Sequence, residues 1–333
     1  MRVLVVDDSA FMRKIITNMI NSDPQLIVVG TAFDGLDALK KISQLRPDVI
    51  TLDVNMPRMD GLTTLKRIMK QHPLPIIMLS AATQEGAETT FTALKLGAVD
   101  YIPKPSGQIS LDIEKVRNEL VDKIKTAAQA KIVTHEPETC SPVRIKQKVK
   151  EKIITIGAST GGPPALEEIL GQLPKNTPPI LIVQHMPSGF THSFAKRLDR
   201  LCSFEIKEAE DGDTINQGQA LIAPGGYHMT VTRDWRIQLD CGPTEHGVRP
   251  AVDPMMRTTA EIYGSETIGV ILTGMGRDGA SGMKAIKKRG GRTIAQDEAT
   301  CTVFGMPKVA IQQGSIDKIL PLSKIPKQIL KWC

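Results

Sequence analysis

A serine between glycines follows an apolar run near the middle of this 333-residue chain. Residues 153–156 are apolar or β-branched, which indicates a buried strand, and Pro163 suits the first turn of a helix that follows. Residues 157–161 fit the Gly-x-Ser-x-Gly pattern, which exposes a nucleophilic serine on a tight strand-to-helix turn. Backbone N–H groups beside Ser159, including that of Thr160, can stabilise an oxyanion.

Two other interpretations of this turn are open: a tight connection without chemistry, and a dinucleotide-binding fingerprint. The fingerprint requires Gly-x-Gly-x-x-Gly and an acidic residue at the end of the next strand. The glycine spacing differs from this pattern, and the next apolar run ends in Gln184 and His185. We therefore favour the nucleophile over the nucleotide site.

Possible partners for Ser159 follow two other apolar runs. His185 comes directly after residues 179–184, and Asp278 lies in the glycine-containing loop after residues 267–273. Together the three side chains offer a nucleophile, a base and a group that orients the base. Their order along the chain, Ser-His-Asp, differs from that of the α/β-hydrolases. Three other histidines lie in polar, turn-rich segments and are weaker candidates for the base: His192, His228 and His246.

A second group of polar residues follows the strands expected in the first third of the chain. Apolar runs alternate there with amphipathic stretches, which predicts a parallel sheet of five strands with helices between them. Carboxyl ends of parallel strands meet at the sheet edge where ligands bind. The polar residues at these ends are Asp7, Asp8, Asp53, Ser80 and Lys104.

These five residues predict a phosphoryl site. Each acid could merely cap a helix or turn, but three converging carboxylates would repel one another unless a cation lay between them. Oxygen ligands of this kind favour Mg²⁺. A lysine and a hydroxyl opposite the carboxylates suit a phosphoryl group, so Asp53 is the candidate phosphate acceptor.

Composition excludes several other classes of protein. Hydrophobic residues make up 41% and charged residues 23%, as in globular proteins. Aromatic residues are only 4%, which disfavours a single-stranded nucleic-acid binder. The five cysteines form no Cys-x-x-Cys pair, so neither a zinc site nor a disulfide framework is expected, and a cytoplasmic location is the default. Signal-peptide and transmembrane patterns are not expected, nor is insertion into a membrane.

Residues 1 to about 125 resemble a response-regulator receiver domain, on the motifs at 6–9, 53–61, 80–81 and 104–105. The resemblance implies phosphotransfer from a chemotaxis histidine kinase onto Asp53. It also implies roles for the surrounding residues. Asp8, Asp53 and the backbone carbonyl of Asn55 would hold Mg²⁺ with help from Asp7; Ser80 and Lys104 would contact the phosphoryl oxygens, and Tyr101 would be the aromatic switch residue.

Residues 151–333 resemble the catalytic domain of the chemotaxis protein-glutamate methylesterases, on the motifs at 157–162, 184–187, 223–228, 249–253 and 273–279. That family removes methyl esters from glutamates on the cytoplasmic helices of methyl-accepting chemoreceptors, and many members deamidate glutamines. The resemblance implies that Ser159 is the nucleophile, His185 the base and Asp278 its orienter. Met275 would supply an N–H to the oxyanion hole, with no cofactor in the esterase reaction.

The fold expected from both halves is α/β. We expect a (βα)5 receiver with a parallel five-stranded sheet at 1–125, a linker at 126–150, and a doubly wound esterase domain with a mainly parallel sheet at 151–333. The unphosphorylated receiver is expected to cover the edge that carries Ser159. The alternatives are an output that binds DNA, which would need a helix-turn-helix, and a non-catalytic output that only docks on receptors. We expect no nucleic-acid partner.

Overall fold

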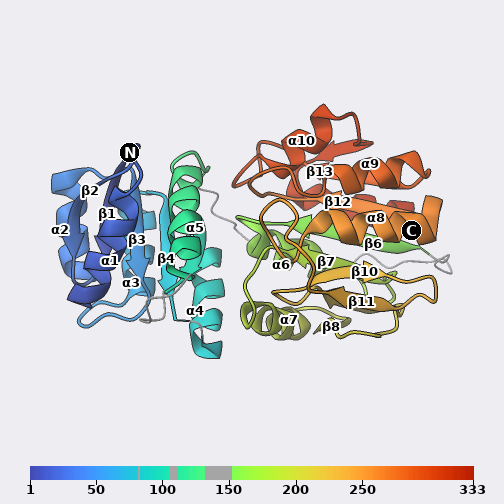
Figure 1. Cartoon of the computed structure of the whole chain (residues 1–333), viewed down its shortest axis with the longest axis horizontal. Coiled ribbons are helices and arrows are strands. Elements are labelled where there is room, and N and C mark those ends of the chain that lie inside the picture. The colour runs from blue at the N-terminus through green and yellow to red at the C-terminus, as the bar shows by residue number, and fades with distance from the viewer. Residues whose placement is uncertain (82, 105–111, 132–151) are drawn as a thin grey trace. The chain divides into compact units, whose positions relative to one another are not determined.

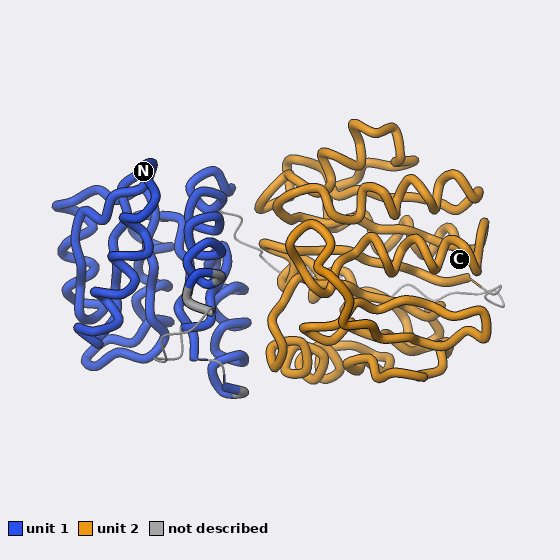
Figure 2. The backbone as a smooth tube through the Cα atoms, viewed as in Figure 1, with its two compact units in different colours: residues 1–135 blue, residues 136–333 orange. Residues whose placement is uncertain are grey.

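The chain was analysed as a computed structural model that describes residues 1–81, 83–104, 112–131 and 152–333. It forms two compact units, Met1–His135 and Glu136–Cys333 (Figure 2). Most of the linker expected at 126–150 lies outside the described residues. Within the described ranges, no helix is both long and apolar enough to cross a membrane.

The first unit contains a five-stranded sheet in the order β2-β1-β3-β4-β5, and all its strand pairs are parallel (Figure 1). This confirms the expected (βα)5 receiver. The strands are β1 (Arg2–Val6), β2 (Ile27–Ala32), β3 (Val49–Asp53), β4 (Ile76–Ser80) and β5 (Asp100–Pro103). The helices are α1 (Ala10–Asn21), α2 (Gly35–Leu45), α3 (Gly61–Gln71), α4 (Gln84–Lys95) and α5 (Asp112–Ala127).

Short polar side chains start the first four of these helices. Ser9, Asp34, Asp60 and Thr83 are the N-caps, and each side chain accepts a hydrogen bond from a backbone N–H in the first turn. Each cap ends the preceding loop at a defined residue. The loops after β1, β3 and β4 are therefore short and hold their polar residues close to the strand ends.

The second unit contains a seven-stranded sheet in the order β14-β13-β12-β6-β7-β9-β8, with every pair parallel. Its strands are β6 (Ile153–Ala158), β7 (Ile180–Gln184), β8 (Glu205–Glu208), β9 (Gln219–Ile222), β12 (Thr267–Ile271), β13 (Arg292–Gln296) and β14 (Lys318–Leu320). An antiparallel hairpin, β10 (His228–Val231) and β11 (Ile237–Asp240), stands apart from this sheet.

Helices cover both faces of the seven-stranded sheet, as expected for a doubly wound domain. One group, α8 (Val252–Tyr263), α9 (Ala280–Lys288) and α10 (Met306–Gln312), packs on β6, β12 and β13. The other group is α6 (Gly162–Leu170), α7 (Phe190–Leu201) and α11 (Ile325–Trp332). Two single 3-10 turns, Gly264–Glu266 and Leu322–Lys324, complete the unit. Along β7, Leu181 and Val183 join the core beneath α8 and α9, so the alternate residues Ile180 and Ile182 face the other layer.

Helix α6 begins at Gly162, so Pro163 lies in its first turn as the sequence predicts. Both prolines of the Gly162-Pro163-Pro164 segment fit in its first turn because N–H groups there need no partner within the helix. The helix therefore begins two residues after Thr160. This places Ser159 directly at the helix N-terminus.

In each sheet the chain adds strands on one side of its first strand and later continues on the other side. In the first unit the chain passes from β1 to β2 on one side and then to β3 on the other; in the second unit it starts at β6, adds β7 on one side and later β12 on the other. Ligand sites of open α/β sheets lie outside the carboxyl ends of strands at such reversals. Asp7 follows β1 and Asp53 is the last residue of β3, while Ser159 and Asp278 lie in the loops after β6 and β12.

Candidate active site

Ser159 and His185 follow neighbouring strands at the same level of the sheet. Ala158 at the end of β6 pairs with Gln184 at the end of β7, and the backbone N–H of His185 donates to the carbonyl of Ala158 over 3.1 Å. On the other side of Ser159, its N–H donates to the carbonyl of Thr273 at 3.0 Å. The β6 end therefore lies between the loops that carry His185 and Asp278.

Ser159 lies on a tight turn and is only partly buried. The N–H of Gly162 donates to the Ser159 carbonyl over 2.7 Å, and Gly161 adopts a left-handed φ of 77°. A Cβ atom at Gly161 would lie 2.4 Å from the hydroxyl oxygen of Thr302, so both conformation and space require glycine there. This is the geometry that the Gly-x-Ser-x-Gly spacing predicted.

His185 and Asp278 form a direct hydrogen bond. The ring Nε2 of His185 lies 2.8 Å from Oδ2 of Asp278, with the His185 side chain 13% exposed and that of Asp278 2% exposed. Because the carboxylate accepts, Nε2 carries the proton in the neutral ring. The other nitrogen, Nδ1, is then the one with a lone pair that can accept a proton from Ser159.

Asp278 also caps the helix that packs on β6. Its Oδ2 accepts from the N–H of Val252 at 2.6 Å, and its Oδ1 accepts from the N–H groups of Asp253 at 3.0 Å and Gly279 at 2.8 Å. Val252 and Asp253 are the first two residues of α8, where the helix dipole favours a negative charge. Burial raises the pKa of Asp278, but the His185 bond and these N–H donors outweigh it and hold the pKa below its ordinary 3.8. Asp278 is thus held as a carboxylate.

Close approach of α8 to β6 depends on Gly157. A Cβ atom at this position would lie 2.4 Å from Cγ1 and 2.8 Å from Cγ2 of Val252. A side chain at Gly157 would therefore push the start of α8 away from the sheet, and the Val252 N–H away from Asp278.

Gln184 joins the nucleophile turn to the loop of the base. Its Nε2 donates to the carbonyl of Ser159 at 2.9 Å and to that of His185 at 3.3 Å, and its side chain is buried. The sequence places Gln184 in the motif at 184–187 and at the end of an apolar run, but it does not predict these two hydrogen bonds. Its position as a buried amide at the end of a core strand, directly before the candidate base, was the available signal.

Thr160 and Met275 flank the serine. Thr160 is buried and its carbonyl accepts from the hydroxyl of Thr273 at 2.9 Å. Met275 is 43% exposed and follows Gly274, where a Cβ atom would lie 2.7 Å from the Ser159 Cβ. Both residues therefore have backbone next to Ser159, as an oxyanion hole requires.

The segment 223–228 lies against the loop that carries His185. A Cβ atom at Gly225 would lie 2.3 Å from the backbone nitrogen of Ser188, and the N–H of Gly225 donates to the Thr191 hydroxyl at 3.0 Å. Ala223 is buried whereas Tyr227 is 46% exposed. The segment thus contributes to the interior of the unit at one end and to its surface at the other.

In the first unit, Lys104 lies between two carboxylates at the sheet edge. Its Nζ is 2.8 Å from Oδ2 of Asp7 and 2.7 Å from Oδ2 of Asp53. Burial raises the pKa of Asp53, and the nearby charge of Asp7 adds to this, against the lowering effect of Lys104. Burial lowers the pKa of Lys104, but its bonds to Asp53 and Asp7 reverse this and raise it. Lys104 is therefore held as a cation.

Asp7, Asp8 and Asp53 could hold a metal ion. Each offers one carboxylate oxygen, and these atoms lie within 4.8 Å of one another. Asp8 is exposed while the other two are buried, so an ion bound there would keep access to water. This set of oxygens fits Mg²⁺, which keeps several waters and uses few protein carboxylates.

Three other residues expected in the phosphoryl site have different surroundings. Asn55 is exposed, and its N–H lies 3.4 Å from Oδ1 of Asp53. The Ser80 hydroxyl is buried and donates to the carbonyl of Gly86 at 3.0 Å. Tyr101 is buried beneath Lys123, whose Nζ is 5.1 Å from the ring centre, and burial raises the Tyr101 pKa well above 10.0.

Family models match both units. Residues 154–329 match the model described as CheB methylesterase, and residues 3–114 match that of the response regulator receiver domain. Together the two matches account for most of the described chain.

Relatives match the chain over its whole length. A protein-glutamate methylesterase/protein-glutamine glutaminase of Pyrococcus abyssi is 52% identical over 341 residues, covering 99% of this chain and 93% of the relative. A protein of the same name from Halalkalibacterium halodurans is 50% identical and covers 100% of this chain and 98% of the relative. The crystal structure of the Thermotoga maritima CheB methylesterase catalytic domain is similar to 56% of this chain and 100% of its own, with 48% identity and a TM-score of 0.54.

Removal of the Asp278 charge should cost stability in a pH-dependent way. Asp278→Asn should lower the free energy of unfolding of the second unit by about 1–2 kcal/mol near neutral pH, because an amide has one acceptor oxygen where the carboxylate uses two. Since the folded-state pKa is below 3.8, this stabilisation is present above that value and is lost as pH falls through the lowered pKa.

Urea unfolding followed by tryptophan fluorescence measures this difference, because Trp235 and Trp332 both lie in the second unit. The difference in the free energy of unfolding between the wild type and Asp278→Asn should be largest near pH 7 and should become smaller below about pH 4. A gap of equal size at both pH values would contradict the assignment of a stabilised carboxylate.

Proposed function

This chain belongs to the CheB methylesterase family, with a response regulator receiver domain before the esterase, and we propose that Ser159, His185 and Asp278 carry out its reaction. It is a phosphorylation-regulated hydrolase that removes methyl groups from protein glutamates and deamidates glutamines. The observation that carries the catalytic assignment is the 2.8 Å bond from His185 to buried Asp278, beside a serine on the adjacent strand end. The alternatives with a DNA-binding or purely docking output are not favoured.

In the first half of the reaction, Ser159 Oγ attacks the ester carbonyl carbon of a glutamyl side chain. Nδ1 of His185 takes the hydroxyl proton as the new C–O bond forms, and the resulting imidazolium is stabilised through Nε2–H by Asp278. The same proton passes to the departing methoxy oxygen, so methanol leaves and an acyl-enzyme remains. For a glutamine substrate the departing group is ammonia.

In the second half, water attacks the acyl-enzyme and His185 takes its proton. Collapse returns that proton to Ser159 Oγ and releases the glutamate side chain. Both tetrahedral intermediates place negative charge on the former carbonyl oxygen. The N–H groups of Thr160 and Met275 and the N-terminus of α6 are proposed to stabilise it.

Control resides in the receiver unit. Asp53 is proposed as the acceptor of the phosphoryl group, with Lys104 and Ser80 as contacts to its oxygens. Asp7, Asp8, Asp53 and the carbonyl of Asn55 would hold Mg²⁺, which neutralises phosphoryl charge when it is bound. Tyr101 is proposed as the residue whose rearrangement reports phosphorylation.

The partners follow from the two units. A receiver domain implies a kinase, and the esterase implies chemoreceptors. We propose a chemotaxis histidine kinase as the phosphoryl donor and the cytoplasmic helices of methyl-accepting receptors as the substrate. The expected domain boundaries, 1–125, 126–150 and 151–333, remain part of this proposal.

Loss of the nucleophile should abolish most of the activity. Ser159→Ala should lower methanol release from methyl-labelled receptor membranes by about 10⁴-fold or more, and adding His185→Ala should cost little further, because triad members act as a unit. Ser281→Ala on the exposed face of α9 is a matched control that should retain full activity. If the two substitutions lowered the rate of methanol release additively in the double variant, this would count against the assignment. Circular dichroism should show that the single and double variants are both folded.

Loss of the phosphate acceptor should uncouple control from catalysis. Asp53→Asn should retain basal methanol release yet show no stimulation by a small-molecule phosphodonor with Mg²⁺, because the amide cannot accept the phosphoryl group. Asp122→Asn, at an exposed acid on α5, should be stimulated like the wild type. Normal stimulation of the Asp53 variant would mean that another residue accepts the phosphoryl group.

A further inference from the structure

Thr273 lies where the loop that carries Met275 meets the turn that carries Ser159 and Thr160. It follows β12 after a single residue and is 1% exposed. Its main chain already contacts the nucleophile turn, because its carbonyl accepts from the Ser159 N–H at 3.0 Å. A buried hydroxyl requires hydrogen-bond partners. The partners of the Thr273 hydroxyl identify the segments that it joins.

The Thr273 hydroxyl joins two segments of the chain. It donates to the carbonyl of Thr160 at 2.9 Å and accepts from the N–H of Val303 at 3.0 Å. The carbonyl of Val303 lies farther from the hydroxyl, at 3.3 Å, and accepts from the N–H of Gly274 at 3.0 Å. The hydroxyl proton therefore serves Thr160, and this one side chain connects the turn after β6 to the segment 303–306.

The segment 303–306 holds the peptide group that includes the Met275 N–H. The N–H groups of Gly305 and Met306 donate to the carbonyl of Gly274 at 3.1 Å and 2.9 Å. Glycine at 305 permits this approach, since a Cβ atom there would lie 2.6 Å from that carbonyl oxygen. In a trans peptide the C=O and the N–H point in opposite directions. The Met275 N–H therefore points away from the segment 303–306.

The peptide group that includes the Thr160 N–H is held in the same way. Its carbonyl belongs to Ser159 and accepts from the N–H of Gly162 at 2.7 Å and from the side chain of Gln184 at 2.9 Å. The Thr160 N–H therefore points away from these two donors. The next carbonyl along the chain is the one that Thr273 holds. Both proposed oxyanion donors thus belong to fixed peptide groups, and Thr273 lies between them.

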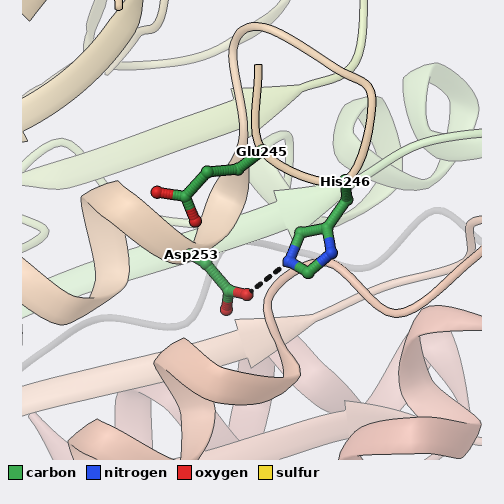
Figure 3. A group of neighbouring side chains, drawn as sticks. All are labelled: Glu245, His246 and Asp253. Atoms are coloured by element: carbon green, nitrogen blue, oxygen red, sulfur yellow. Dashed lines mark hydrogen bonds and ion pairs between the residues drawn. The ribbon is translucent and has the colours of Figure 1, made fainter. Parts of the chain in front are cut away.

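The far end of the same loop has its own contacts. Asp278 accepts from the first N–H groups of α8. Asp253 in that helix accepts from the N–H of Gly282 at 2.6 Å, and its other oxygen lies 2.8 Å from Nε2 of His246 (Figure 3). None of these bonds involves Thr273. A change at Thr273 should therefore affect the oxyanion donors and leave Asp278 in place.

We propose that Thr273 is a positioning residue of the esterase: its hydroxyl sets the spacing and direction of the Thr160 and Met275 N–H groups that bind the oxyanion. This rests on the proposed roles of Ser159, Thr160 and Met275. Negative charge on the substrate oxygen develops as the tetrahedral intermediates form, so correctly placed donors stabilise the transition state more than the bound ester. Loss of the hydroxyl should therefore lower kcat and change KM little.

The test compares Thr273→Val with Thr273→Ser in the full chain, with kcat and KM measured by methanol release from methyl-labelled receptor membranes. Valine has the shape of threonine without its hydroxyl. It should lower kcat by about 10- to 100-fold and change KM by less than about twofold. Serine keeps the hydroxyl and loses only a methyl group, so Thr273→Ser should retain most of the wild-type kcat.

Thr293→Val is the matched control. Thr293 is also buried, and its hydroxyl also joins two segments: it accepts from the N–H of Asp317 at 2.9 Å and donates to the Asp317 carboxylate at 3.1 Å. It is the second residue of β13 and so lies away from the carboxyl ends of the strands. Thr293→Val should keep the wild-type kcat. A loss as large as that of Thr273→Val would overturn the proposal, because any buried hydroxyl would then have the same effect.

Three other results would overturn the proposal: a wild-type kcat in folded Thr273→Val, equal losses of kcat in the valine and serine variants, or a raised KM with an unchanged kcat. If circular dichroism shows that Thr273→Val does not fold, Thr273→Ala removes the hydroxyl without placing a methyl group against polar atoms. If neither variant folds, Thr273→Ser decides: a retained kcat supports the proposal, and a kcat lost despite the hydroxyl overturns it.

Ser159→Ala is assayed in parallel to separate this inference from the proposed function. If Ser159→Ala retains activity, the proposed catalytic residues are wrong and the role of Thr273 is wrong with them. If Ser159→Ala is inactive while folded Thr273→Val has the wild-type kcat, the role of Thr273 alone is wrong.

Discussion

A buried negative charge at Asp278 is the constraint on which the catalytic unit depends. The side chain is 2% exposed and must find its partners within the protein. Its partners are the first N–H groups of α8, the N–H of Gly279 and the ring of His185. Each partner fixes part of the site. The helix contacts bring α8 onto β6, where only glycine fits at position 157, and the ring contact decides which nitrogen of His185 faces the nucleophile.

The receiver unit gathers charge at the same kind of place. Lys104 lies between Asp7 and Asp53 where the strand order reverses, with Asp8 exposed beside them. Here the excess of carboxylates over cations leaves oxygens for a metal ion, whereas at Asp278 the N–H groups at the start of α8 stabilise the charge. Parallel sheets supply both sites because their strand ends converge and the helices that follow point their N-termini at the same edge.

Much of this arrangement could be predicted from the sequence. Apolar runs in the sequence end where the strands end. The polar residues after these runs therefore lie at the sheet edges that the sequence predicts, from Asp7 to Lys104 in the first unit and from Ser159 to Asp278 in the second. The contact of Gln184 with the nucleophile turn could not be predicted, because it depends on tertiary contacts between segments far apart in the chain. The motif at 249–253 lies at the start of α8, but periodicity along the chain does not predict that Asp278, 25 positions after Asp253, caps this helix.

The most direct test of this account is the tautomer of His185 in the resting enzyme, measured by ¹⁵N NMR on protein labelled at its six histidines. The account predicts that Nε2 carries the proton, with a strongly downfield ¹H signal that disappears in Asp278→Asn, and that Nδ1 is unprotonated and available to Ser159. A neutral ring protonated at Nδ1, or an Nε2–H signal unchanged in Asp278→Asn, would contradict it.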